Sequence, residues 1–264
     1  MRAVTTPELS TLTVAVDGPI ARLTLNRPDR LNALSRLSLI ELAHAARWLD
    51  TQQDVKVAIV HGAGRAFTAG FDLDDFGNID TERSPMEAND LGRQMAEALT
   101  NTRALTIAAV HGWCVGGGLV IAASCDLRIA ATDARFSIPE VDLGIPLAWG
   151  GIPRLVREIG PALTKELVLT CRPFDAAEAL AVRFLNRVVP GDELMATAEQ
   201  LAAELAGKSS LTLVQTKRHV NAVAEAMGST AGSGTDALVL AAALADPESR
   251  AVGRSYQQRR RTRA

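Results

Sequence analysis

Residues 112–119 read GWCVGGGL, and three consecutive glycines open a segment that otherwise has the apolar composition of a buried helix. Glycine in a helix interior costs roughly 1 kcal/mol relative to alanine, so the run is locally unfavourable unless a bare backbone is useful there. An apolar strand-like run, TIAAVHG, leads into this stretch, and a second, DLRIAA, follows the helix. The order of strand, glycine turn, helix and strand predicts an α/β fold in which some group approaches the backbone closely at the glycines.

The alternation of strands and helices extends toward the N-terminus and gives way to helices toward the C-terminus. The runs TLTVAV and ARLTLN flank the turn Asp17-Gly18-Pro19 and predict a β-hairpin. Further predicted segments are a helix at 34–49, a strand from 55, a helix at 86–100 and an almost wholly helical stretch at 149–245. We therefore expect an α/β core over residues 1–195 and a helical C-terminal region over 196–264, which ends in the basic tail RSYQQRRRTRA.

The composition is that of an ordinary globular protein and disfavours several classes of function. The 264 residues are 47% hydrophobic and 22% charged, and the formal net charge of -2 gives no electrostatic case for binding nucleic acid or an anionic membrane. No apolar run approaches the roughly 18 residues of a membrane-spanning helix, and the first residues lack the apolar segment of a signal peptide. The three cysteines lie far apart, which favours reduced thiols over a disulfide framework or a metal cluster. We expect a cytoplasmic protein without a bound metal.

A second small-residue loop has the same placement as the first. Residues 66–73 read AFTAGFDL and directly follow the strand-like run VKVAIVHG. Residues 116–118 also open a helix, where free N–H groups and the helix dipole favour negative charge. Two such loops side by side could point two N–H groups at one oxygen, as in the oxyanion hole for an ester or thioester carbonyl. Each loop alone is equally typical of close packing or of a phosphate-binding turn.

One carboxylate stands in an apolar segment. Residues 136–155 read FSIPEVDLGIPLAWGGIPRL, in which Glu140 lies between Pro139 and Gly144. Partial desolvation raises the pKa of a carboxylic acid and suits it to exchange a proton near neutral pH. The alternative is a structural carboxylate that pairs with Arg154 or Arg157.

The motifs taken together resemble the enoyl-CoA hydratase/isomerase family, also called the crotonase family. The set consists of LNRPDRLNAL, AFTAGFDL, GWCVGGGL followed by CDLRIA, FSIPEVDLGIP, GGIPRL and a helical C-terminus, in this order from about residue 23. The resemblance implies a ClpP/crotonase-type spiral of ββα units with a helical C-terminal region that forms trimers, and hexamers as dimers of trimers. It also implies an acyl-CoA substrate and no cofactor beyond the CoA moiety of that substrate.

The resemblance assigns roles to residues of this chain. It implies that the N–H groups of Phe71 and Gly117 form the oxyanion hole and that Glu140 transfers protons. The segment from Ala69 to Leu73 and the loop with Arg30 would hold the CoA moiety, and Trp149 would narrow the acyl end of the pocket. The expected substrate-binding residues are Arg30, Ala33, Ala69, Asp72, Leu73, Gly116, Val120, Pro139 and Trp149.

One departure from the family pattern bears on the chemistry. Hydratases of the family use two glutamates, and Val120 occupies the position of the first. A valine cannot hold a water molecule or move a proton, so hydration of a simple enoyl-CoA is in doubt. One glutamate suffices for Δ3,Δ2-enoyl-CoA isomerases and is also what phenylpropenoyl-CoA hydratase-lyases keep, although the only tyrosine, Tyr256, lies in the tail. Ala148 stands where dehalogenases of the family carry a nucleophilic aspartate.

Two further readings bound the prediction. The chain could be an acyl-CoA binder that has lost its activity, because a fold does not guarantee chemistry. A Ser/His/Asp hydrolase is disfavoured, since no serine lies in a G-x-S-x-G elbow. His61 and His111 each precede a glycine at a strand end, where packing of the turn is the expected role.

Overall fold

The computed structural model describes residues 6–76 and 84–262 and contains a six-stranded mixed sheet at its centre. The sheet has the order β1-β2-β3-β4-β6-β9. Its strands are β1 (Leu12–Asp17), β2 (Ile20–Leu25), β3 (Val57–Gly62), β4 (Leu105–Val110), β6 (Leu127–Ala131) and β9 (Arg187–Val189). The first two form the predicted antiparallel hairpin, and every later pair is parallel. The hairpin and the strands predicted near residues 55, 106 and 126 are confirmed.

Short strands outside the large sheet give the chain a repeating ββα path. A three-stranded sheet contains β5 (Trp113–Val115), β7 (Arg135–Ser137) and β8 (Phe174–Asp175). The chain runs from β4 through β5 into helix α4 (Gly117–Ser124), and again from β6 through β7 into α5 (Gly151–Thr170). After β3, Thr68 bridges to Cys114, which places an earlier turn beside β5. The predicted spiral of ββα units is therefore present.

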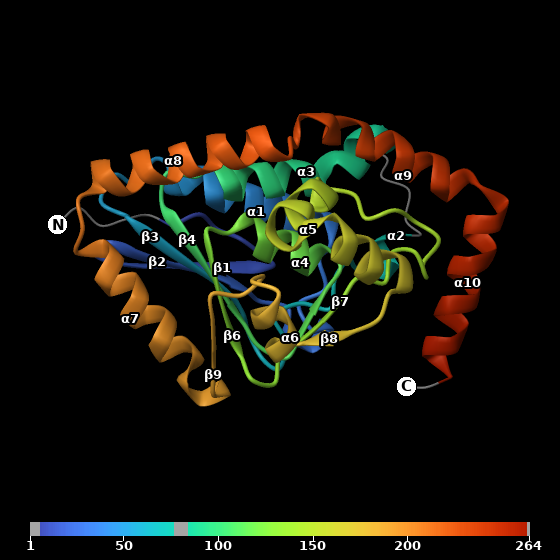
Figure 1. Cartoon of the computed structure of the whole chain (residues 1–264), viewed down its shortest axis with the longest axis horizontal. Helices are drawn as coiled ribbons and strands as arrows, with labels where there is room; N and C mark the ends of the chain where they lie inside the picture. The colour runs from blue at the N-terminus through green and yellow to red at the C-terminus, as the bar shows by residue number, and fades with distance from the viewer. Residues whose placement is uncertain (1–5, 77–83, 263–264) are drawn as a thin grey trace.

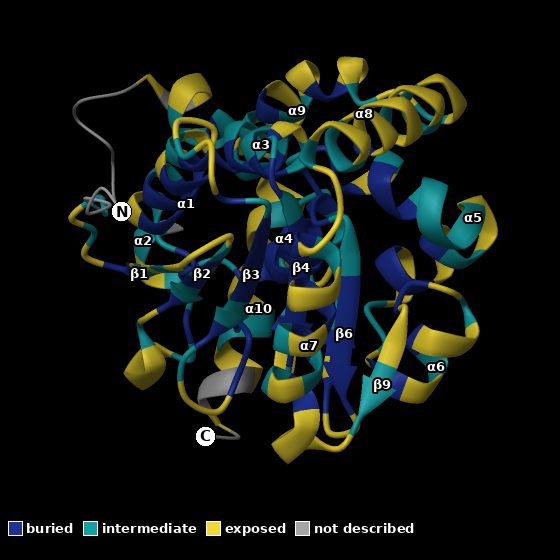
Figure 2. Ribbon diagram, turned by 90° about the vertical axis from the view of Figure 1, so that its left-hand side faces the viewer, coloured by how far each residue is buried: buried dark blue, intermediate teal, exposed yellow. Residues whose placement is uncertain are grey.

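The two faces of the large sheet are covered by different helices. In β3, Ala58 and Val60 belong to the same apolar core as helices α1 (Arg36–Leu49), α3 (Pro85–Asn101) and α4, whereas Val57 and Ile59 pack with α7 (Leu194–Ala206). This alternation follows from the period of two residues in a strand. Figure 2 shows α7 with an exposed outer side in front of buried strands. The remaining helices are α2 (Leu73–Phe76), α6 (Ala176–Ala181), and 3-10 turns at Pro28–Arg30, Gly191–Glu193 and Ala231–Thr235.

Two expectations about the second half of the chain were wrong. The boundary expected after residue 195 falls inside α7, which packs on the sheet through buried residues and so belongs with the core. The stretch 149–245 is not almost wholly helical, because β8 and β9 interrupt it. These strands span two and three residues. Such short strands carry too little alternation to be seen in a sequence.

The last three helices, α8 (Ser210–Met227), α9 (Asp236–Ala245) and α10 (Pro247–Arg261), arch over one side of the molecule (Figure 1). Backbone contacts hold α10 against the loop that follows β7. A Cβ atom on Gly144 would overlap the Ser249 carbonyl, and one on Gly253 would lie 2.6 Å from the Leu143 oxygen. Within residues 6–76 and 84–262, no helix is both long and apolar enough to cross a bilayer.

A buried ion pair ties α8 to the sheet. Lys217 is 6% exposed, and its Nζ donates to the Ala104 carbonyl at 2.9 Å and to Asp126 Oδ2 at 2.8 Å. The same carboxylate oxygen accepts the backbone N–H of Thr106 at 2.7 Å. Because α8 buries only this one of its side chains, the pair is its main polar attachment to the core.

We expect Lys217→Ala to lower the free energy of unfolding by roughly 3 kcal/mol, because it leaves the Asp126 carboxylate buried without its cation. Urea unfolding measures the change. Lys208→Ala is the matched control, since its ion pair with Glu204 is exposed and 3.5 Å long, and we expect a loss below about 0.5 kcal/mol. Equal losses in the two variants would contradict the assignment.

Candidate active site

The two small-residue loops lie side by side. The Thr68 N–H donates to the Trp113 carbonyl at 2.9 Å, and the Val115 N–H donates to the Thr68 carbonyl at 3.1 Å. Gly70 has a φ of +86°, and a Cβ atom there would lie 2.9 Å from the Val115 oxygen. The glycine is therefore required both by its backbone conformation and by the contact between the loops. This contact brings residues 66–73 next to the start of α4.

The N–H groups of Phe71 and Gly117 belong to backbone that can present them to one space. Leu34 donates its N–H to the Gly70 carbonyl at 2.8 Å and accepts the Asp72 N–H at 3.0 Å. Successive N–H groups of extended backbone point to opposite sides, so the Phe71 N–H faces away from Leu34. Gly117 is the first residue of α4, where an N–H has no acceptor inside its helix. Both residues line the same cavity. Their expected role as an oxyanion hole stays a prediction.

Each glycine of the triplet leaves room for a different neighbour. Gly116 has a φ of +51°, and a Cβ atom there would overlap Glu140 Oε1. A Cβ atom on Gly117 would overlap the indole ring of Trp149, and one on Gly118 would lie 2.5 Å from Thr68 Cγ2. The bare backbone predicted from the sequence is therefore used by protein side chains, and the first of them is the Glu140 carboxylate.

Glu140 carries a buried carboxylate without a partner. Among the described residues, its Oε2 atom is buried and accepts no hydrogen bond. Burial raises the pKa of Glu140 to about 7, although the carboxylate interacts with its own backbone N–H, which lowers it. The alternative of an ion pair with Arg154 or Arg157 is wrong, because Arg157 pairs with Glu225 at 2.9 Å and Arg154 donates to the Gly150 carbonyl at 3.0 Å. A buried carboxylate with a raised pKa and no partner is typical of a functional site.

A cavity of about 660 Å³, including its open mouth, joins these groups. Its lining comes from five parts of the chain: Arg36, Leu39, Phe71, Ala88, Asn89, Gly117, Glu140, Ile145, Pro146, Leu147, Ala148, Trp149, Leu240 and Leu244. Of the residues predicted from the sequence, Phe71, Gly117, Glu140 and Trp149 meet here. Glu140 is the only carboxylate in the lining.

Sequence analysis missed the contributions of α3 and α9. Ala88 and Asn89 come from α3, and Leu240 and Leu244 come from α9, about 100 residues after Glu140 in the chain. Small and apolar residues at helical spacing are typical of any packed helix, so no local signal marked them. Only the return of the C-terminal helices over the core brings them to the site.

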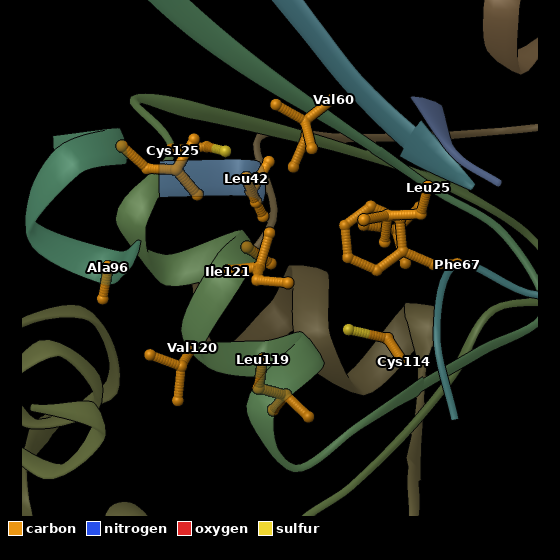
Figure 3. Close-up of a cluster of buried hydrophobic side chains, with 14 of the residues drawn as sticks. Leu25, Leu42, Val60, Phe67, Ala96, Cys114, Leu119, Val120, Ile121 and Cys125 are labelled. Carbon is orange, nitrogen blue, oxygen red and sulfur yellow. The ribbon is translucent and has the colours of Figure 1, made fainter. Parts of the chain in front are cut away.

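Val120 lies in the core, and the expectation that it contacts the substrate is not supported. Its side chain is 1% exposed and belongs to the apolar cluster around α4, with Leu119 and Ile121 as neighbours in the chain (Figure 3). Its Cγ2 lies 3.0 Å from the position of a Cβ built on Gly151. Gly116 and Pro139 are likewise absent from the lining of the cavity, and both lie beside Glu140.

The residues expected to hold CoA form an ion-pair cluster outside the cavity lining. Asp72 is 5% exposed and pairs with Arg27 at 2.9 Å and with Arg30 at 3.2 Å. Burial alone would raise the pKa of Asp72, but the bonds from Arg27 and from the Asp74 N–H lower it below its usual value. Arg30 also contacts the Asp74 carboxylate and stays half-exposed.

Backbone bonds hold the other expected CoA-binding residues in the same region. The Ala33 carbonyl accepts a bond from Arg27, the Ala69 N–H donates to the Leu31 carbonyl at 2.9 Å, and Leu73 begins α2. These contacts show how the two loops are fixed to each other. The CoA-binding role of these residues stays a prediction.

The histidines serve the turns, as expected. His61 Nε2 lies 2.9 Å from Thr24 Oγ1, and His111 Nε2 lies 2.9 Å from the Gly64 carbonyl. In the described part of the chain, no three His, Cys, Asp or Glu side chains are grouped so that they could hold a metal ion.

Known proteins resemble the chain over most of its length. The profile of the family described as enoyl-CoA hydratase/isomerase matches residues 16–262. A short-chain-enoyl-CoA hydratase of Clostridium acetobutylicum is 35% identical over 215 residues, covering 81% of this chain and 82% of that protein. A peroxisomal Delta(3,5)-Delta(2,4)-dienoyl-CoA isomerase of Arabidopsis thaliana is 37% identical over 215 residues, covering 76% and 77%. The crystal structure of an enoyl-CoA hydratase/isomerase from Pseudoalteromonas atlantica T6c has a TM-score of 0.87 and 27% identity, covering 95% of this chain and 98% of that one.

The extent of these matches confirms what the order of the motifs indicated. The profile spans the ββα spiral and the C-terminal helices alike, and the solved structure superposes over nearly the whole chain. The protein therefore belongs to the enoyl-CoA hydratase/isomerase family and has the crotonase fold.

Proposed function

We propose that this protein is an enzyme that moves a proton between two carbons of an acyl-CoA thioester, as a Δ3,Δ2-enoyl-CoA isomerase does. The observation that carries the proposal is that Glu140 is the only carboxylate lining the cavity and that its buried Oε2 has no hydrogen-bond partner among the described residues. The names of the relatives, which include enoyl-CoA hydratases and a dienoyl-CoA isomerase, support an acyl-CoA substrate. No cofactor beyond the CoA moiety is part of the proposal.

The thioester carbonyl would lie between the N–H groups of Phe71 and Gly117. Removal of a proton from the α-carbon places negative charge on the carbonyl oxygen, and two fixed N–H donors stabilise that charge without reorganising. Gly117 begins α4, so the helix dipole adds to its N–H. Because these donors are backbone groups, their position depends on the contact between the two loops and not on side-chain rotamers.

Glu140 would act as base and then as acid in one cycle. The ionised carboxylate takes a proton from C2 of a 3-enoyl thioester, and the electron pair moves through the new C2–C3 double bond to the carbonyl oxygen. The protonated Glu140 then returns that proton to C4 as the dienolate collapses. The double bond has moved to C2–C3, and Glu140 is ionised again. A pKa of about 7 is suited to this exchange at neutral pH.

Hydration is the second candidate, because relatives 35 to 37% identical are named enoyl-CoA hydratases. The site offers less support for it. Adding water requires a group that holds and activates the water molecule, and Val120 is buried and apolar at the position of the second hydratase glutamate. A phenylpropenoyl-CoA hydratase-lyase, with one glutamate, would show itself by its substrate, and an inactive acyl-CoA binder by tight binding without turnover.

The proposal includes assembly and location. We propose a homotrimer, or a dimer of trimers, in the cytoplasm. Support for assembly comes from large apolar side chains that α8 and α9 expose in the single chain, namely Leu211, Val220, Val223, Met227, Leu238 and Val239. Exposed apolar surface of this kind is typical of a surface that binds protein.

Replacing Glu140 by Gln should lower kcat/KM by about 100-fold to 10,000-fold, because the proton carrier is lost. NMR with trans-3-enoyl-CoA, crotonyl-CoA and feruloyl-CoA identifies the reaction, and we expect turnover of the 3-enoyl thioester. In the wild type, kcat/KM should rise with pH to a plateau, with a midpoint near 7, since the ionised form is the base. Asp142→Asn is the control, because this acid is exposed in the same loop. Full activity of Glu140→Gln would refute the proposed role.

The raised pKa of Glu140 also predicts how stability varies with pH. The folded chain binds this proton up to about pH 7, whereas the unfolded chain releases it near 4.5. The contribution of Glu140 to the free energy of unfolding therefore falls by about 3 kcal/mol as pH rises through this window, and it is constant above it. Urea unfolding at pH 5 and pH 8 should show a smaller loss for Glu140→Gln than for the wild type. Equal losses would mean that the carboxylate is solvated.

Two substitutions at one position separate the Gly117 N–H from the space around it. Gly117→Ala and Gly117→Pro both add a Cβ atom against Trp149, but only proline removes the N–H, and proline is tolerated at the first position of a helix. We expect kcat of the proline variant to be about 100-fold to 1,000-fold below that of the alanine variant. Equal kcat values would exclude this N–H as an oxyanion donor.

A further inference from the structure

Trp149 is wedged between two helices at the edge of the cavity. A Cβ atom on Gly92 of α3 would overlap Cγ, Cδ2 and Cε2 of the indole, and one on Gly117 of α4 would overlap Cζ3. The ring also meets Phe71 edge-on, with centroids 5.9 Å apart and an interplanar angle of 78°. The indole therefore fills the gap between α3 and α4 immediately beside the proposed carbonyl position.

The backbone at this point is held in an unusual conformation. Trp149 has a φ of +63° and Gly150 one of +67°, so two successive residues are left-handed, which is uncommon for a tryptophan. The turn is fixed from both sides. The Gly150 N–H donates to Asp236 Oδ2 of α9 at 2.8 Å, and its carbonyl accepts a bond from Arg154 of α5 at 3.0 Å. Strained backbone that is fixed by its surroundings is typical of functional positions.

The glycine in α3 points to the same role. Gly92 lies inside a 17-residue helix, where glycine is the least favourable residue apart from proline. The indole explains it, because any side chain at this position would displace the ring. The chain thus combines a large residue at 149 with a bare position at 92, and together they close the space between the two helices.

We propose that Trp149 sets the length of the acyl group by closing the α3–α4 end of the cavity. This inference rests on the proposed function. An acyl chain that leaves a carbonyl bound at Gly117 meets the indole after a few carbons, and further methylenes find no apolar surface in that direction. Trp149 is thus a specificity-determining residue of the proposed reaction.

Binding of saturated thioesters tests this without turnover, because they have no double bond to move. Isothermal titration of CoA and of butanoyl-, hexanoyl-, octanoyl- and decanoyl-CoA gives Kd against chain length. In the wild type, Kd should fall with length and then level off. In Trp149→Ala it should continue to fall by about fourfold per added methylene for at least two more methylenes. In Gly92→Ala, which pushes the ring toward the cavity, Kd should level off at a shorter chain.

Further variants keep the test decisive. Trp113→Ala is the matched control, since this indole is 43% exposed on β5, and its profile should equal that of the wild type. If Trp149→Ala does not fold, Trp149→Phe should show a smaller extension in the same direction. An identical limit in the wild type and in the Trp149 and Gly92 variants would overturn the inference while leaving the acyl-CoA function intact. Failure of the wild type to bind any of these thioesters would overturn both proposals.

Discussion

The Glu140 carboxylate lies against the backbone of Gly116, where any other residue would place its Cβ atom. That contact constrains both partners. It requires a glycine with positive φ before α4, and it holds a carboxylate away from water with one oxygen unpaired among the described residues. Burial without a partner raises the pKa of Glu140 to about 7, which costs stability and is useful to a proton carrier. A structural role would instead have supplied an arginine, and Arg154 and Arg157 bind elsewhere.

The repeating path of the chain makes this contact possible. Each ββα turn sends one strand into the large sheet and a short extended segment beside it, so that successive turns stack their loops. Thr68 and Cys114 are bridged in this way, and the Gly116 N–H is bound by the Ser137 carbonyl of the next turn at 2.9 Å. Phe71, Gly117 and Glu140 thus come from three consecutive turns. The site is rigid because it is built on backbone hydrogen bonds between those turns.

The C-terminal helices complete the cavity from the other side. Through backbone contacts at Gly144 and Gly253, α10 braces the loop that carries Glu140, and α9 adds Leu240 and Leu244 to the wall. Asp236 of α9 also holds the turn that presents Trp149. The helical region expected to serve assembly therefore also shapes the site of its own chain, and changes in these helices would alter the pocket without touching Glu140.

The sequence by itself determined the family, the α/β spiral and the central residues of the site, because glycines before a helix and a carboxylate in an apolar segment are local features with a direct physical meaning. It also showed that a second glutamate is missing. Only the tertiary structure decided that Val120 is buried, that Gly92 receives the indole of Trp149, and that α9 lines the cavity. These facts join residues from about 30 to more than 100 positions apart, and such long-range packing leaves no periodic trace in the chain. The two- and three-residue strands β8 and β9 escaped for the related reason that pairing, not local propensity, forms them.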